Sequence, residues 1–199
     1  MNREGFTREL RGTVFNALTG RGGDVSGRPD GDVRGMLLAI GGPAKTKSGI
    51  NLTAAAAALG VSRRTAERWV TNASQKSRLR GANLAKVVAQ SRQAATTKAG
   101  RRRAMAAARR GSLTRRGAKL SITGKQGPTR AGTDYRRRRR IDLMLGPGDV
   151  EEMMAAYEQG GDQGYMSWVE AYAGENYLDD WGVDSLDKLE VSDPREDGL

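Results

Sequence analysis

The chain has 199 residues and a formal net charge of +11, with 34 Lys and Arg against 23 Asp and Glu. It contains no cysteine and no histidine, which excludes disulfides, thiolate zinc sites, histidine bases and the two-histidine metal site of relaxase-type nickases. We therefore predict no metal site. The apolar runs at 36–40 and 54–59 are too short to cross a bilayer, and the N-terminus lacks a secretory core, so we expect a soluble cytoplasmic protein.

The charge is distributed in blocks along the chain. Residues 1–60 carry a net +3, residues 61–140 a net +22 and residues 141–199 a net −14. Blocks of one sign repel internally unless something neutralises them, and nucleic acid is the ordinary partner of a basic block. The alternative is that the two large blocks neutralise each other within the fold or across a homodimer. We predict that DNA is the partner, which would place the protein at the nucleoid.

The first half of the chain predicts helices. Residues 3–18 carry apolar side chains at helical spacing, and a turn-rich linker follows. Residues 32–40 predict a helix that stops at Gly41-Gly42-Pro43, and residues 82–96 predict another. We assign residues 1–28 to an N-terminal helix and linker, and residues 29–97 to a DNA-binding domain.

The stretch LTAAAAALGVSRRTAERWV, residues 52–70, predicts a helix-turn-helix. Apolar spacing gives a short first helix, Gly60 supplies a left-handed turn, and Ser62 is placed to cap a second helix. Ala66 faces back to the first helix, and the outward face of the second would read DNA. An alanine-rich helix pair without DNA function is the alternative. The expected DNA contacts are Ser62, Arg63, Arg64, Thr65, Glu67 and Arg68.

Residues 98–117 predict a basic arm, because they carry lysines and arginines without an acid. Arg101, Arg102 and Arg103 are the expected phosphate contacts in this arm. The alternative is a solvated, disordered tail.

From residue 118 the apolar period changes to that of strands. We predict a small α+β domain over residues 118–192, in the order strand–strand–helix–helix–strand, followed by a tail at 193–199. The fold class is α+β, with an all-helical DNA-binding region first. The predicted pieces are strands at 118–125 and 138–145, a helix from Pro147 to Gly160-Gly161, a helix at 165–177 and a strand within 185–193.

The loop between the first two predicted strands places hydroxyl groups against a run of arginines, in AGTDYRRRRR at 131–140. A hydroxyl can attack a nucleotide α-phosphate where positive charge stabilises the anionic transition state. The alternative is that Thr133 is a turn residue without chemistry.

The order of these features resembles the terminal proteins of actinobacterial linear chromosomes and plasmids. The resemblance covers about residues 52–192, and its matching pieces are AALGVSRRTAERWV, RQAATT at 92–97, GTDYRRRRRIDLMLGPG and LDKLEVSD. In that family a threonine hydroxyl in the loop is linked covalently to the 5′ phosphate of the telomeric DNA end. It primes the DNA polymerase that fills in the recessed strand.

The resemblance implies that Thr133 is the attachment residue. Asp134, which follows it, either orients the hydroxyl or caps the loop. Tyr135, where the family tends to have a hydroxyl or an acid, is a rival nucleophile, and Thr129 is a weaker one. The chain would need no cofactor of its own, because the polymerase would supply the deoxynucleotide and Mg²⁺. A telomere-associated protein is a further implied partner. The arginines that would neutralise the DNA end are Arg136, Arg137, Arg138, Arg139 and Arg140.

Two other functions explain part of the pattern. A transcriptional or plasmid partition and replication regulator would read a palindrome with the helix-turn-helix and dimerise through the acidic domain. It gives no reason for the junction of hydroxyls and arginines. A recombinase or nickase that uses Tyr135 is disfavoured because histidine is absent. We therefore predict a protein primer, and not an enzyme, that binds single- or double-stranded telomeric ends.

Overall fold

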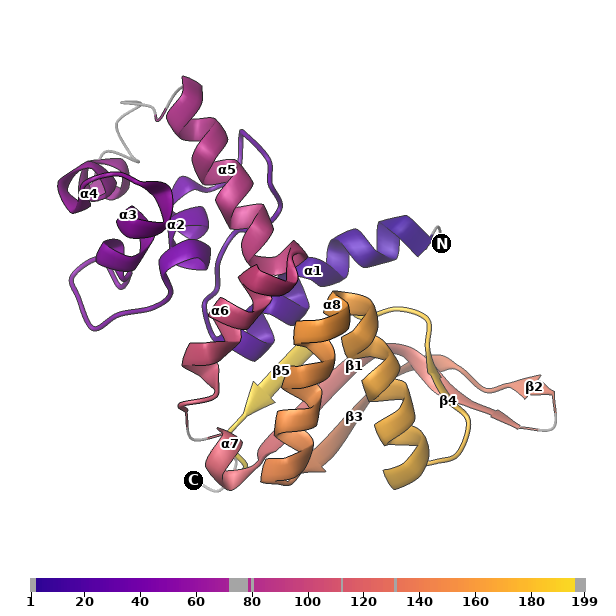
Figure 1. The fold of residues 1–199 in the computed structure, drawn as a ribbon. Coiled ribbons are helices and arrows are strands. Elements are labelled where there is room, and N and C mark those ends of the chain that lie inside the picture. The colour runs from indigo at the N-terminus through magenta and orange to yellow at the C-terminus, as the bar shows by residue number, and fades with distance from the viewer. Residues whose placement is uncertain (1–2, 72–78, 80, 112, 131, 196–199) are drawn as a thin grey trace.

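Helices occupy the first half of the chain, and an antiparallel sheet with one long helix occupies the second (Figure 1). The computed structural model describes residues 3–71, 79, 81–111, 113–130 and 132–195. The helices are α1 (Arg3–Thr19), α2 (Val33–Gly41), α3 (Leu52–Leu59), α4 (Arg63–Thr71), α5 (Gly81–Thr96), α6 (Lys98–Ala108), α7 (Leu113–Arg116) and α8 (Pro147–Asn176). The strands are β1 (Ala118–Arg130), β2 (Thr133–Asp134), β3 (Arg137–Leu145), β4 (Trp181–Val183) and β5 (Lys188–Ser192). The predicted α+β class is confirmed.

Short polar side chains and glycine fix the ends of the early helices. The Asp32 carboxylate accepts hydrogen bonds from the first amides of α2, and the Asn51 side chain accepts one from the amide of Ala54 in α3. Such bonds satisfy amides that have no partner within the helix. Gly60 ends α3 at φ 65° and ψ 37°, a left-handed conformation that glycine adopts without strain. The predicted turn at this glycine is confirmed.

Strand β1 is the centre of the sheet. It pairs antiparallel with β3 along Ala118–Gln126, and its other edge pairs with β5 and then with β4. Beyond these partners, β1 and β2 continue as a hairpin that turns at Gly132, where φ is 77°. Helix α8 covers one face of the sheet (Figure 1). The predicted inward residues Ile141, Leu143 and Leu145 are buried.

Helix α8 consists of two helical segments that meet at a kink. Gly161 has φ 64° and ψ −146°, which is not helical. The break predicted at Gly160-Gly161 is therefore confirmed. A Cβ atom at Gly161 would lie 3.2 Å from Nη1 of Arg101, so the kink also gives this guanidinium close access to the helix backbone.

The buried apolar side chains form two separate clusters. One lies among α2, α3, α4 and α5, around Met36, Leu37 and Ile50. We call residues 33–96 the helical lobe. The other joins the sheet and α8 to α6 and to Val14 and Phe15 of α1. Helix α1 therefore packs with the C-terminal core, a contact that the division of the sequence into segments does not anticipate. We call α1 together with residues 98–195 the sheet lobe.

Arg101 joins α6 to its neighbours and is only 7% exposed. Its guanidinium donates to the carbonyls of Glu158 at 3.0 Å and Gln159 at 3.1 Å in α8, and to those of Ala95 and Thr96 at the end of α5. The last carbonyls of a helix have no intrahelical partner, which is why this site accepts a buried arginine. The expectation that Arg101 contacts phosphate is corrected, whereas Arg102 and Arg103 are exposed.

Arg101→Ala is expected to lower the free energy of unfolding by about 2–4 kcal/mol, because it leaves buried carbonyls without donors. Arg102→Ala is the matched control. Its side chain is 77% exposed, so we expect a change within about 0.5 kcal/mol. Urea denaturation of both variants measures the difference, and equal stabilities would contradict the structural role of Arg101.

Asp162, just after the kink, carries a buried carboxylate whose Oδ1 has no hydrogen-bond partner among the described residues. Burial raises its pKa from 3.8 to about 6, although the charges of Arg11 and Arg101 oppose the shift. The folded state thus binds this proton more tightly than the unfolded state. The stabilisation that comes from this tighter proton binding is fully present below pH 4 and is lost as the pH rises through about 6.

Asp162→Asn is therefore expected to remove the fall in stability between pH 4 and pH 6. It should raise the free energy of unfolding at pH 7 by up to about 3 kcal/mol. Thermal denaturation of both proteins between pH 4 and pH 7 measures it. An unchanged pH dependence in the variant would show that Asp162 is not the titrating group.

Candidate nucleic-acid interface

The excess positive charge of the protein belongs to the helical lobe. Residues 33–96 contain eleven Lys and Arg and one acid, a net +10, so the rest of the chain sums to +1. The blocks seen along the sequence are thus redistributed in space by folding. A polyanion would be attracted first to the helical lobe.

The sheet lobe neutralises its own basic residues. Arginines of β3 and of the segment before it pair with acids that come from β3 itself or from the segments around β4 and β5. Basic and acidic side chains thus pair within this lobe, as the alternative of neutralisation within the fold predicts. These pairs are Arg136–Asp184 at 2.6 Å, Lys125–Asp184 at 2.9 Å, Arg138–Asp187 at 3.1 Å and Arg140–Asp142 at 2.9 Å.

Some basic side chains of α6, of α7 and of the segment between them pair with acids in the same way. Arg109 binds Glu158 at 2.6 Å and Glu151 at 3.1 Å, and the hydrogen bond that its guanidinium donates to Glu158 raises the pKa of Arg109. Arg116 lies 3.7 Å from Asp193. The predicted basic arm is thus packed and paired only in part. Arg101 is buried and Arg102 lies 4.0 Å from Glu158, whereas Arg103 and Arg115 are exposed and make no ion pair with any described residue.

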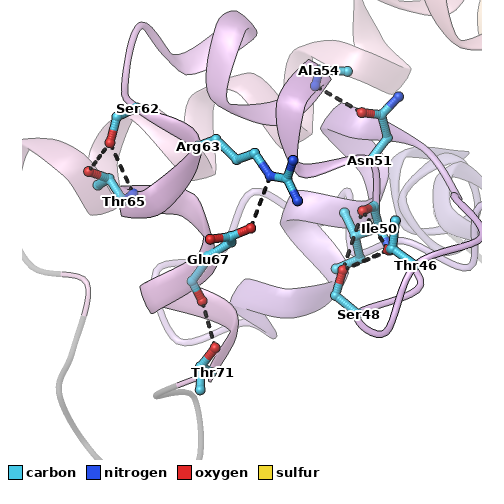
Figure 2. Close-up of polar contacts among 10 residues, drawn as sticks. All are labelled: Thr46, Ser48, Ile50, Asn51, Ala54, Ser62, Arg63, Thr65, Glu67 and Thr71. Carbon is cyan, nitrogen blue, oxygen red and sulfur yellow. Dashed lines mark hydrogen bonds and ion pairs between the residues drawn. The ribbon is translucent and has the colours of Figure 1, made fainter.

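The predicted helix-turn-helix is formed by α3 and α4. The amide of Thr65 donates to Ser62 Oγ at 3.1 Å, which confirms the predicted cap, and the two hydroxyls lie 2.9 Å apart (Figure 2). Ala66 is fully buried between the helices. Ser62 and Thr65 were both expected to contact DNA. Their hydroxyls instead bond each other at the N-terminal cap of α4, although Ser62 remains exposed.

The outward face of α4 separates its arginines into two kinds. Arg63 Nε binds Glu67 Oε1 at 2.9 Å, so these two expected contacts are paired with each other (Figure 2). Arg64 and Arg68 are exposed and make no ion pair with any residue in the described part of the chain. They are the side chains of α4 that are free to meet bases and phosphates.

A hollow that the sequence did not reveal lies between α4 and the loop before α3. The loop folds back through a bridge between Pro43 and Ile50, and Arg34 donates to the carbonyl of Ser48 at 2.6 Å. Figure 2 shows the loop facing Arg63 and Glu67 of α4. The segment KTKSG at 45–49 could have indicated it. We call it the α4 hollow, and its polar lining comprises Arg34, Thr46, Lys47, Ser48, Asn51, Thr53, Arg63, Glu67 and Thr71.

Thr133 lies at the far end of the sheet lobe, in the hairpin that projects away from α3 and α4 (Figure 1). Its side chain is exposed, and its hydroxyl makes no hydrogen bond with the described residues. Of the two roles expected for Asp134, the structure shows the capping of the loop and not the orientation of this hydroxyl. Its carboxylate accepts hydrogen bonds from the backbone amide of Arg136 and from Arg136 Nε, both at 2.9 Å, which lower the pKa of Asp134.

The five arginines after Tyr135 do not form one uniform positive field. Arg136, Arg138 and Arg140 are in the ion pairs given above. Arg139 donates to the carbonyl of Tyr135 at 3.0 Å and lies 5.5 Å from the centre of the Trp181 ring. Arg137 is exposed and has no ion pair with any described residue.

Within the described ranges, no group of three or more acidic side chains is placed to hold a metal ion. No described helix is long and apolar enough to cross a membrane. Comparison with protein-family models, with curated proteins and with solved structures finds no match.

Arg64→Ala and Arg68→Ala are each expected to reduce the preference for a duplex selected from a random library over unselected duplex. The loss is about 1–3 kcal/mol where the arginine meets a guanine edge. Arg63→Ala is the control, because Glu67 already occupies its guanidinium. Competition binding measures the ratio. Full discrimination in both variants would show that another face of α4 reads the DNA.

Proposed function

We propose that the protein is a terminal protein of a linear replicon, which binds DNA through the helical lobe and offers Thr133 as a protein primer. The observation that best supports this proposal is the exposed Thr133 hydroxyl on a projecting hairpin, away from the lobe that carries the excess positive charge. The helix-turn-helix can hold the DNA end while the hairpin enters a partner enzyme.

The hairpin is well anchored for this role. Strand β1 runs from the centre of the sheet to the turn, and its last part pairs with β4, where Pro128 lies opposite Trp181. Arg136 bonds both Asp134 and Asp184 and so ties the base of the hairpin to the segment after β4. A hydroxyl on a fixed protrusion can reach a recessed active site and keep its position there.

The chemistry is a phosphoryl transfer. Thr133 Oγ attacks the α-phosphorus of a deoxynucleoside triphosphate, a phosphoester bond forms, and pyrophosphate leaves. The hydroxyl proton passes to a base of the DNA polymerase, which also supplies the Mg²⁺ and the nucleotide. The polymerase, the telomeric DNA end and a telomere-associated protein are partners that the family resemblance supports.

Tyr135 and Thr129 are the competing attachment residues. Tyr135 is two residues from Thr133, is also exposed, and its backbone amide donates to the carbonyl of Pro128 at 3.1 Å. Thr129 is half-buried, and its amide donates to the carbonyl of Asp180. The exposure of Tyr135 makes it the stronger competitor.

A DNA-binding regulator is the second candidate. The observation that favours it is the Asp134 carboxylate, which binds Arg136 and leaves the Thr133 hydroxyl without an orienting partner among the described residues. In this case the helix-turn-helix would carry the whole function. Attachment of nucleotide separates the two candidates.

Thr133→Ala is expected to bind DNA normally, because the change lies on the surface and shifts stability by less than about 0.5 kcal/mol, yet to accept no nucleotide. Thr133→Ser should keep part of the labelling, and Tyr135→Phe and Thr129→Ala should keep most of it. The assay is transfer of a radiolabelled deoxynucleotide in an extract of the native cells, followed by nuclease digestion.

Trypsin cleavage after Arg130 and Arg136 gives the peptide AGTDYR, on which fragmentation locates the residual nucleotide. Labelled Thr133→Ala together with unlabelled Tyr135→Phe would make tyrosine the attachment residue. Labelling of both variants with an unmodified AGTDYR peptide would move the search to Thr129, which lies on the tryptic peptide QGPTR. Absence of label from the unaltered protein would leave the regulator as the function.

A further inference from the structure

A hollow of about 560 Å³ lies at the base of the hairpin. Tyr135 stands in it with 53% of its surface exposed, in a chain with few aromatic residues. Ligand sites are commonly concave surfaces of this size with an apolar wall and a few polar groups. We call it the hairpin hollow. It is lined by Pro128, Asp134, Tyr135, Arg136, Arg137, Arg139 and Leu178.

The apolar part of the hairpin hollow suits a flat ring. Pro128 and Leu178 contribute carbon surface, and the exposed Tyr135 ring adds an aromatic face. The backbone of Tyr135 is fixed, because its amide donates to Pro128 and its carbonyl accepts from Arg139. An exposed aromatic side chain on a fixed backbone is the kind of platform on which unpaired bases stack.

The arginines of the hairpin hollow differ in what they are free to do. Arg136 is held by Asp134 and Asp184, and Arg139 lies against the Trp181 ring. Arg137 is exposed and makes no ion pair within the described residues. Among the arginines of this hollow, it is therefore the one that can bind a phosphate without giving up an ion pair, a carbonyl hydrogen bond or a ring contact.

We infer that the hairpin hollow binds single-stranded DNA, with one base stacked on Tyr135 and the adjoining phosphate on Arg137. Tyr135 then serves as a stacking platform and is not the nucleophile. That this strand is the template opposite Thr133 rests on the proposed function. That single-stranded DNA binds the hairpin hollow does not rest on it.

The surroundings of the hairpin hollow favour a single strand over a duplex. Duplex DNA keeps its bases stacked on one another, so they cannot cover the Tyr135 ring. The exposed Asp179 and Asp180 directly follow Leu178 and would repel a second phosphate backbone. The excess positive charge that would attract duplex DNA lies on the helical lobe instead.

The test is fluorescence anisotropy with a labelled single-stranded oligonucleotide and, separately, a blunt duplex, using the full chain. Tyr135→Ala should weaken single-strand binding by about five- to one-hundred-fold, and Tyr135→Phe should retain it because the ring remains. Tyr177→Ala is the matched control. Tyr177 is also 53% exposed, but it does not line the hollow. Arg137→Ala should lower the slope of log affinity against log salt by about 0.7. Duplex affinity should stay unchanged in all four variants.

Equal single-strand affinity in Tyr135→Ala and Tyr177→Ala would overturn the inference. So would a Tyr135→Ala variant that keeps single-strand affinity but no longer binds purified polymerase, because the hollow would then be a protein-docking surface. The proposed function is scored separately, by nucleotide labelling of Thr133→Ala and Tyr135→Phe. Lost labelling in Thr133→Ala with unchanged single-strand binding in Tyr135→Ala would refute the hollow and leave the primer intact.

Discussion

Ion pairing inside the sheet lobe is the interaction on which the rest of the account depends. Arg136 and Lys125 share Asp184, Arg138 meets Asp187, and these acids follow β4. Each pair is partly exposed and contributes little to stability by itself. Together they neutralise much of the basic run, while residues 33–96 carry a net +10 with a single acid. Folding thereby decides which part of the chain would attract a polyanion.

The same distribution of charge places the two candidate sites in different lobes. The helical lobe carries unpaired arginines on α4, and the sheet lobe carries an exposed hydroxyl on a hairpin that points away from them (Figure 1). The buried Arg101 holds the carbonyls of α5 and α8 together, so the two lobes are joined through packed helices and not by a loose linker. In the proposed function, DNA is held at one end of the molecule and chemistry is offered at the other.

Local signals predicted much of the fold. The cap at Ser62, the turn at Gly60 and the change of apolar period at residue 118 depend on neighbours in sequence and were readable from it. Arg101 differs from Arg102 only in its position around the helix, so packing alone assigns one to the interior. The partner of Arg136 lies 48 residues away. Strand β4 has three residues, too few for a period. The candidate hydroxyl was predicted, but the actual partner of the Asp134 carboxylate was not.

The salt dependence of duplex binding tests the central claim, that the helical lobe binds DNA while the sheet lobe neutralises itself. Duplex affinity is measured across salt concentrations for Lys47→Ala in the α4 hollow and for Arg138→Ala in the sheet lobe, which remove one charge each. The account predicts that Lys47→Ala reduces the slope of log affinity against log salt by about 0.9 and that Arg138→Ala leaves it unchanged. A reduced slope in Arg138→Ala with an unchanged slope in Lys47→Ala would place the DNA on the sheet lobe and contradict the account.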